Sequence, residues 1–234
     1  MTRPFVPIAA ATAVAAIAAT AVAALVVGGA TTISGTPTWP GAKLNKVLLT
    51  EADFPPGVWY GRILEDPGKP DNAGGPPSML SIPAGCSNGL TDVIATYAER
   101  GPGAAAKYGV TYSGVKVLMT VLTSPLNLNE LATEAARCQS FNVYFDRNSA
   151  AIPMTTTKLR SARPGELVYE QTMKLQGNDT TVYMSFENVG RMAVFGMGFP
   201  TIQISEGQPP PPKGSLPQTF TDIAGRQAQH IQDS

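Results

Sequence analysis

The sequence predicts a single α+β domain, an α/β sandwich in which helices pack on an antiparallel β-sheet, with one disulfide and an apolar N-terminal segment. Three observations support this prediction. Several segments alternate apolar and polar residues with period two and are separated by turn-forming residues. Three other segments repeat apolar residues every three or four positions, as amphipathic helices do. The two cysteines, Cys86 and Cys138, lie beside two of these helical patterns.

The central helix is expected between Ser124 and Phe145. Asn127 can accept a hydrogen bond from a free backbone N–H group of the first turn, and Glu130, three residues on, can bond back to the cap. The apolar residues that follow at helical spacing define one buried stripe: Leu128, Leu131, Ala135, Cys138, Phe141 and Phe145. Cys138 is therefore expected on the buried face.

The other elements are expected in the order strand, helix, two strands, the central helix, four strands and a final helix, with about six or seven strands. Glu65–Pro83 is rich in glycine and proline and is expected to be a long loop. Lys43–Thr50 is expected to form one or two helical turns, and longer helices are expected over residues 87–100 and 218–231. Strands are expected at Val58–Leu64, Ala105–Tyr112, Val115–Thr123, Ile152–Leu159, Glu166–Leu175, Val182–Glu187 and Met192–Phe199.

The N-terminal segment is expected to direct export. Residues 8–27 form an uncharged run of 20 mostly apolar residues after Arg3. Two interpretations remain open, because signal-peptide cores span about 7–15 residues and about 20 residues cross a bilayer. Residues 1–30 are either a cleaved signal peptide or a signal anchor that holds the protein to the membrane through residues 5–28. Either one makes the protein extracytoplasmic, secreted or anchored at the cell envelope.

The rest of the chain is expected to form a linker over residues 31–43 and one domain over residues 44–234, with a proline-rich loop at 207–214. Lys and Arg together number 17, as do Asp and Glu, and only 15% of the residues are charged. A nucleic-acid interface needs concentrated positive charge. We therefore expect no nucleic-acid partner.

Cys86 and Cys138 are predicted to be bridged. They lack the C-x-x-C spacing of a reactive pair, and export places them in an oxidising compartment. The bridge would tie two helices together and remove about 4 kcal/mol of unfolded-chain entropy.

No catalytic or metal-binding arrangement stands out in the sequence. The only histidine, His230, lies near the C-terminus and offers no Ser-His-Asp triad. One histidine and two cysteines do not make a zinc ligand set, and the aspartates are too scattered for a calcium loop. We expect no cofactor, no metal and no catalytic residue.

Two groups of side chains are candidate functional residues. Glu170 and Glu187 could face each other across a hairpin as the carboxylate pair of a hydrolase, although both are expected on the polar side of their strands. Trp59, Tyr60 and Arg62 are the ligand-binding candidates. Tyr60 and Arg62 share one face of their strand, next to the long loop, where a cation beside an aromatic ring could receive an anionic head group.

Several short motifs resemble a known family. They are Leu48-Leu49-Thr-Glu-Ala-Asp53-Phe54-Pro55-Pro56-Gly57, the cysteine ahead of the first core helix, Ala-Ala-Arg-Cys138-Gln-Ser-Phe141 and the closing strand meander. Over residues 44 to 232 they resemble mycobacterial exported proteins of unknown function, which are similar in plan to the extracellular sensor domain of receptor Ser/Thr kinases. The kinase sensor carries two disulfides, whereas this chain can form one.

The resemblance implies an α/β sandwich with a ligand- or partner-binding role, and it supplies no catalytic residue. We therefore expect a non-catalytic envelope module that binds a small ligand, a lipid, a glycan or a protein partner. The alternative is a cell-envelope hydrolase with an unrecognised carboxylate site.

Overall fold

The computed structural model describes residues 41–63, 79–98, 103–112, 115–175, 178–200 and 215–234. The chain divides into two units, residues 1–36 and residues 37–234, and every described residue belongs to the second unit. The export segment, most of the expected linker and the proline-rich loop 207–214 lie outside the described residues. Among the helices that the structure describes, none is long and apolar enough to cross a membrane.

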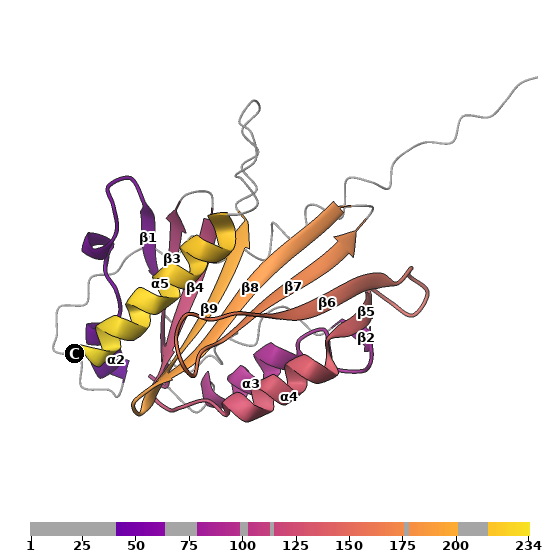
Figure 1. Cartoon of the computed structure of the whole chain (residues 1–234), viewed down its shortest axis with the longest axis horizontal. Helices are drawn as coiled ribbons and strands as arrows, with labels where there is room; N and C mark the ends of the chain where they lie inside the picture. The colour runs from indigo at the N-terminus through magenta and orange to yellow at the C-terminus, as the bar shows by residue number, and fades with distance from the viewer. Residues whose placement is uncertain (1–40, 64–78, 99–102, 113–114, 176–177, 201–214) are drawn as a thin grey trace, which may run out of the picture. The chain divides into compact units, whose positions relative to one another are not determined.

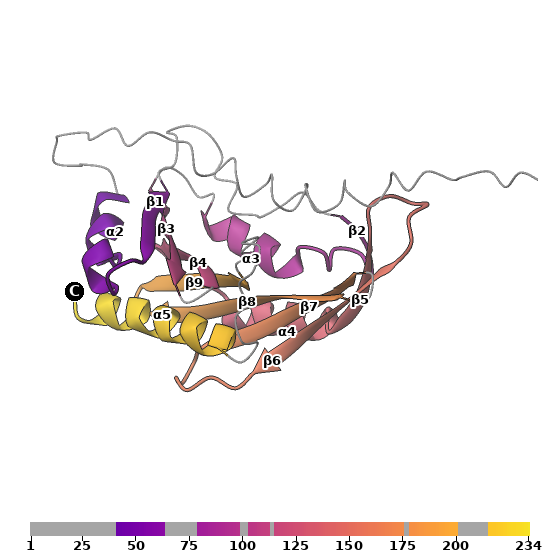
Figure 2. The ribbon, with the colours of Figure 1, turned by 90° about the horizontal axis from the view of Figure 1, so that it is seen from above.

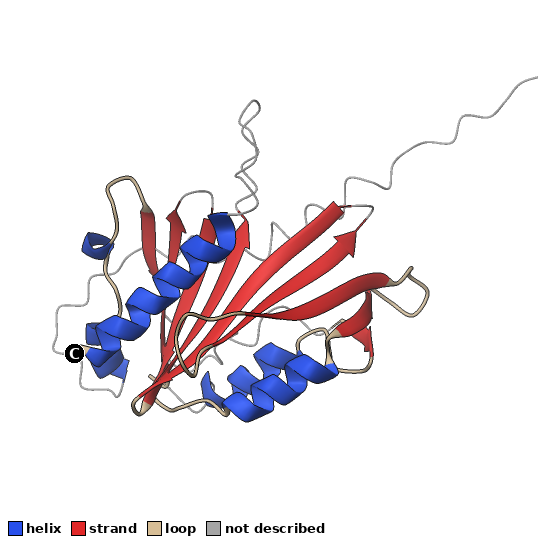
Figure 3. Ribbon diagram, viewed as in Figure 1, coloured by secondary structure: helices blue, strands red, loops and turns tan. Residues whose placement is uncertain are grey.

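Helices and strands follow one another along the chain in a mixed order that ends in a long helix (Figures 1 and 3). The elements are α2 (Gly41–Val47), a 3-10 turn (Glu51–Asp53), β1 (Trp59–Ile63), β2 (Leu80–Ile82), α3 (Gly89–Ala98), β3 (Ala105–Tyr112), β4 (Val115–Leu122), α4 (Leu128–Arg137), β5 (Ser140–Tyr144), β6 (Ile152–Leu159), β7 (Leu167–Leu175), β8 (Asn178–Val189), β9 (Met192–Pro200) and α5 (Ser215–Gln232).

The strands form one nine-stranded sheet in the order β1-β3-β4-β9-β8-β7-β6-β5-β2. All eight strand pairings are antiparallel. The sheet has two halves, β1-β3-β4 and β9-β8-β7-β6-β5-β2, that meet where β4 pairs with β9. β9 is the last strand in the chain but lies inside the sheet. The predicted α+β class, with helices packed on an antiparallel sheet, is confirmed.

Helices cover both faces of the sheet, and Figure 2 shows α5 and α3 on opposite sides of it. On the first face, which we name the α5 face, Phe220 and Ile223 of α5 pack with Val117, Val194 and Tyr183. On the second, the α4 face, residues from α3 and α4 pack against alternate strand residues: Leu90, Ile94 and Leu131 against Tyr169, Phe186 and Phe195. Period-two alternation sends neighbouring strand residues into these two separate cores.

α5 lies close to the sheet because β9 carries Gly196 and Gly198 beneath it. A Cβ atom built on Gly198 would lie 2.9 Å from Cγ of Phe220, and one on Gly196 would lie 3.0 Å from Cε2 of the same ring. Phe220 is fully buried. These two glycines therefore make room for the ring that fixes α5 on the sheet.

The predicted central helix is wrong in its second half. α4 starts as expected, with the Asn127 side chain accepting from the backbone N–H of Glu130 at 3.2 Å, but it ends at Arg137 with Cys138 as its C-cap. Strand β5 follows at Ser140–Tyr144 and buries Phe141, and Phe145, just beyond the strand, is 56% exposed. Phe141 satisfies the helical spacing and the strand alternation alike, so the stripe continued past the true end of the helix.

The expected strand count of six or seven is also wrong, because β2 and β5 were missed. β2 has three residues, Leu80–Ile82, inside the segment that was expected to be a loop. Three residues are too few to show an alternation, and glycine and proline surround them. The remaining expected strands are confirmed within a few residues.

Replacing Gly198 with alanine should destabilise the fold, because the new methyl group meets the root of a buried aromatic side chain. We expect the free energy of unfolding in urea to fall by about 1–3 kcal/mol, the usual cost of overpacking. In a Phe220→Ala background, which removes Cγ and Cδ2 of the ring, the same substitution should cost less, since the two positions are in contact. An equal cost in both backgrounds would show that Phe220 is not the group that requires the glycine.

Candidate functional site

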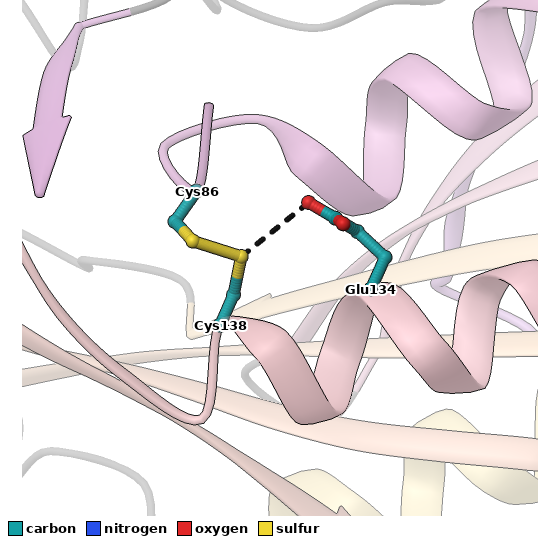
Figure 4. A group of neighbouring side chains, drawn as sticks. All are labelled: Cys86, Glu134 and Cys138. Atoms are coloured by element: carbon teal, nitrogen blue, oxygen red, sulfur yellow. Dashed lines mark hydrogen bonds between the residues drawn. A yellow bond between two sulfur atoms is a disulfide. The ribbon is translucent and has the colours of Figure 1, made fainter. Parts of the chain in front are cut away.

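A disulfide holds the C-terminal end of α4 to the segment that leads into α3 (Figure 4). Cys86 and Cys138 are bonded, with their Cα atoms 5.4 Å apart, and both are buried. The sulfurs pack with Phe141, Val143 and Ile152 in a small apolar cluster. The predicted Cys86–Cys138 bridge is confirmed.

Two charged side chains of α4, Glu134 and Arg137, lie beside this bridge. The Oε1 atom of Glu134 lies 3.4 Å from Sγ of Cys138 (Figure 4). Arg137 forms an ion pair with Glu134 and donates from Nη1 to the carbonyl of Ala84 at 2.9 Å. Bonded sulfurs carry no proton and are not thiolate ligands, so the group Cys86, Glu134 and Cys138 is a structural junction in this state rather than a metal site.

Removing the bridge with the double substitution Cys86→Ala/Cys138→Ala should lower the free energy of unfolding by about 4 kcal/mol, because it frees a loop of 52 residues in the unfolded chain. Urea denaturation of the variant beside the oxidised and the reduced native protein measures this. The reduced protein should behave like the variant. Oxidised protein that is no more stable than the variant would contradict the prediction.

A groove lies between the end of α4 and strands β6 and β7. The volume of this groove is about 250 Å³. A second hollow, at the sheet edge near β2, has a volume of about 280 Å³. The helix contributes alanines and the strands contribute polar side chains to the lining of the groove: Ala132, Ala135, Ala136, Gln139, Thr156, Lys158 and Tyr169. The disulfide fixes the helical wall, because Cys138 directly precedes Gln139.

Two polar side chains in the lining of this groove are buried, Tyr169 and Thr156. The exposed fraction of Tyr169 is 2%, and its ring packs on Phe186 with centroids 6.1 Å apart. Burial raises the pKa of its hydroxyl. No hydrogen bond joins that hydroxyl to any residue that the structure describes. The hydroxyl is not one of the fully enclosed atoms that lack a partner, so it is accessible from the groove. The groove therefore offers a free hydroxyl that can donate to a ligand.

The second hollow lies at the open edge of the sheet, where β2 pairs with β5. It is lined by Leu80, Ser81, Ile82, Tyr144 and Arg147. Leu80 and Ile82 are 48% and 64% exposed. This hollow is therefore a shallow surface of exposed apolar side chains, without a buried polar group.

The carboxylates that come together are Glu166 and Glu187, not the expected pair. Glu170 lies opposite Tyr183 and Glu187 opposite Val194, so Glu170 and Glu187 do not face each other. Arg163 forms ion pairs with both Glu166 and Glu187, and both carboxylates are buried. The expectation that Glu187 lies on a solvated side is wrong, because its face of the sheet is the α5 face.

Burial raises the pKa of Glu187, Arg163 opposes this, and nearby Glu166 adds to it. The folded protein therefore keeps a proton on this carboxyl at pH values where the unfolded chain has lost it. Because the folded state then binds more protons than the unfolded state, this group makes stability fall as the pH rises from the ordinary glutamate range through the raised pKa.

The variant Glu187→Gln should lose this pH dependence. Lowering the pH from 7 towards 5 should increase the stability of the native protein relative to that of the variant, as measured by urea denaturation at each pH. Glu130→Gln, which removes one carboxylate at an exposed position, is measured beside it as the control for the change in net charge. Parallel curves for the native protein and Glu187→Gln would show that Glu187 does not titrate differently on folding.

The structure brings two of the three ligand-binding candidates together. Tyr60 and Arg62 lie on the α5 face, where the Tyr60 ring stacks on Tyr108 at 5.5 Å and its hydroxyl donates to the carbonyl of Leu49 at 2.8 Å. Arg62 donates to the carbonyl of Asn45 at 2.6 Å. Their polar atoms therefore serve local contacts.

Trp59 lies on the opposite face of β1, and 46% of it is exposed. Its indole lies over Gly61 and Gly109, where built Cβ atoms would lie 3.0 and 3.4 Å from the ring. Most of the neighbouring loop, residues 64–78, lies outside the described residues. The ligand-binding role of Trp59, Tyr60 and Arg62 stays a prediction.

Comparison with known proteins gives a fold without a named activity. No family model matches the sequence, and no curated protein matches it. Among solved structures, the fold is similar to that of an uncharacterized protein from Mycobacterium smegmatis, the Rv0999 ortholog. The TM-score is 0.51 at 11% identity, over 82% of this chain and 95% of that chain. This supports the resemblance to mycobacterial proteins of unknown function at the level of the fold.

Proposed function

We propose that this protein is a non-catalytic, extracytoplasmic module of the cell envelope that binds a small ligand or lipid in the groove between α4 and strands β6 and β7. The observation that carries the proposal is the Tyr169 hydroxyl, which lines the groove in a side chain that is 2% exposed and has no partner among the described residues. Binding sites typically combine an apolar wall with a few placed polar groups. The alanines of α4 and the polar side chains of β6 and β7 fit that description.

An extracytoplasmic location is part of the proposal. The apolar run at residues 8–27 supports export, either as a cleaved signal or as a retained anchor. The Cys86–Cys138 bridge fits an oxidising compartment. The similarity in plan to a kinase sensor domain also belongs to the proposal, as a sensor-like or carrier-like role.

The hydrolase alternative has less support. A glycosidase of the usual kind needs two carboxyl groups, one of which donates a proton while the other is free to attack or to activate water. Glu166 and Glu187 both bind the guanidinium of Arg163, and Ser161 also donates to Glu166. This arrangement favours a structural role for the two carboxylates.

Thermal denaturation in the presence of envelope lipids and glycans tests the proposal. A ligand at 100 times its Kd adds about 2.7 kcal/mol to the stability of the folded state. For a domain of this size that is a rise in Tm of roughly 5–10 °C. Ala136→Leu should abolish the rise, because Ala136 lines the groove and is exposed, so that a larger side chain fills the groove without entering the core.

Thr133→Leu is the matched control. Thr133 is also exposed on α4 but does not line the groove. This variant should keep the full rise in Tm. A ligand whose effect survives in Ala136→Leu binds elsewhere, and a screen in which no compound raises Tm argues against a binding module.

A further inference from the structure

The polar end of the groove is set by the register of two adjacent strands. Lys158 of β6 lies directly opposite Tyr169 of β7, and Thr156 lies opposite Gln171. Directly opposed residues of an antiparallel pair point to the same face of the sheet. Lys158 and Tyr169 are therefore neighbours on the α4 face, and both line the groove.

The groove offers two free donors, Lys158 and Tyr169, beside Gln139 and Thr156, whose side chains can both donate and accept. Lys158 is exposed and forms no ion pair within the described part of the chain, and the Tyr169 hydroxyl is unpaired there too. Thr156 already accepts a bond from Gln171 at 3.3 Å. No carboxylate is among the lining residues, and Glu134, the nearest acidic residue of α4 in sequence, is bound to Arg137. A lysine ammonium can only donate, and a phenol readily does so.

The opposite wall is apolar and close. Ala135 and Ala136 lie three and four positions after Ala132, so the three alanines share one side of α4. The helix therefore presents methyl groups and backbone to the groove. A volume of about 250 Å³ is below the usual range of drug-sized sites, about 300–1,000 Å³. The ligand that fits is short and slender rather than a folded polymer.

We propose that the groove selects a small anionic amphiphile, an aliphatic chain that ends in a carboxylate. The carboxylate accepts from the Lys158 ammonium and the Tyr169 hydroxyl, and the chain lies along the alanines of α4. Hydrogen bonds to an ionised group are the stronger kind, and here the carboxylate and the ammonium are both charged. Lys158 is the exposed donor and Tyr169 the buried one, so the carboxylate lies at the mouth of the groove. This inference rests on the proposed binding function and adds the chemical class of the ligand.

Calorimetric titration of the full chain with three eight-carbon probes tests the inference. Octanoate carries the carboxylate, octanol is neutral and octylamine is cationic. We expect octanoate to bind at least tenfold more tightly than either of the others. Lys158→Gln should weaken octanoate binding at least tenfold, and Tyr169→Phe about threefold or more, since it removes only the hydroxyl and keeps the ring on Phe186.

Lys174→Gln is the matched control, because Lys174 is an exposed lysine on β7 whose position in the strand places it on the other face of the sheet. The Lys174→Gln variant should bind octanoate with the same affinity as the native protein. Absence of octanoate binding, equal affinity for octanol, or unchanged affinity in Lys158→Gln would each overturn the inference.

A failure of the octanoate test does not by itself exclude ligand binding in the groove. A neutral lipid or glycan that raises Tm in the native protein and not in Ala136→Leu would keep the groove as a binding site while excluding the anionic ligand. If octanoate does not bind and no compound raises Tm in a way that depends on Ala136, the groove is not a binding site.

Discussion

The pairing of β4 with β9 is the constraint on which the rest of the structure depends. It joins β1, β3 and β4 to the six remaining strands, and it is buried on both faces. Val117 and Val121 lie under α5, whereas Leu122 and Ala193 belong to the core beneath α3 and α4. Gly196 and Gly198 lie in the same pairing and set how closely α5 approaches. Without this pairing, each half of the sheet would have an unpaired edge strand and would expose its part of the two apolar cores.

The parts of the fold that the sequence predicted are those with a clear local signal. The start of α4 has a cap at Asn127 and an apolar stripe. α5 has the stripe Phe220, Ile223, Gln227 and Ile231, all of it buried. Gln227 fits a buried face because its amide bonds Val47 and Leu49 at the end of α2. The end of α4 had one signal only, a spacing shared by helix and strand.

The groove could not be predicted because its chemistry arises only from strand register. Lys158 and Tyr169 are eleven positions apart in sequence and become neighbours through the pairing of β6 with β7. The alanines that complete it carry no chemical signal, and the missed burial of Glu187 has a similar cause, since long-range packing of α5 covers its strand face. Trp59, Tyr60 and Arg62 stood out because aromatic and charged residues are visible in a sequence, while shape is not.

The position of the disulfide has a consequence for the order in which this chain assembles. Both cysteines, together with α3, β3, β4 and α4, precede β9 in the sequence. In a chain that is exported from its N-terminus, the covalent loop can close while the outer edge of β4 still has no neighbour. An unpaired edge of that kind readily captures strands from other molecules. On the proposed export route, oxidation would fix α3 to α4 before β9 is available, and the interior of the sheet would be complete only when β9 pairs with β4.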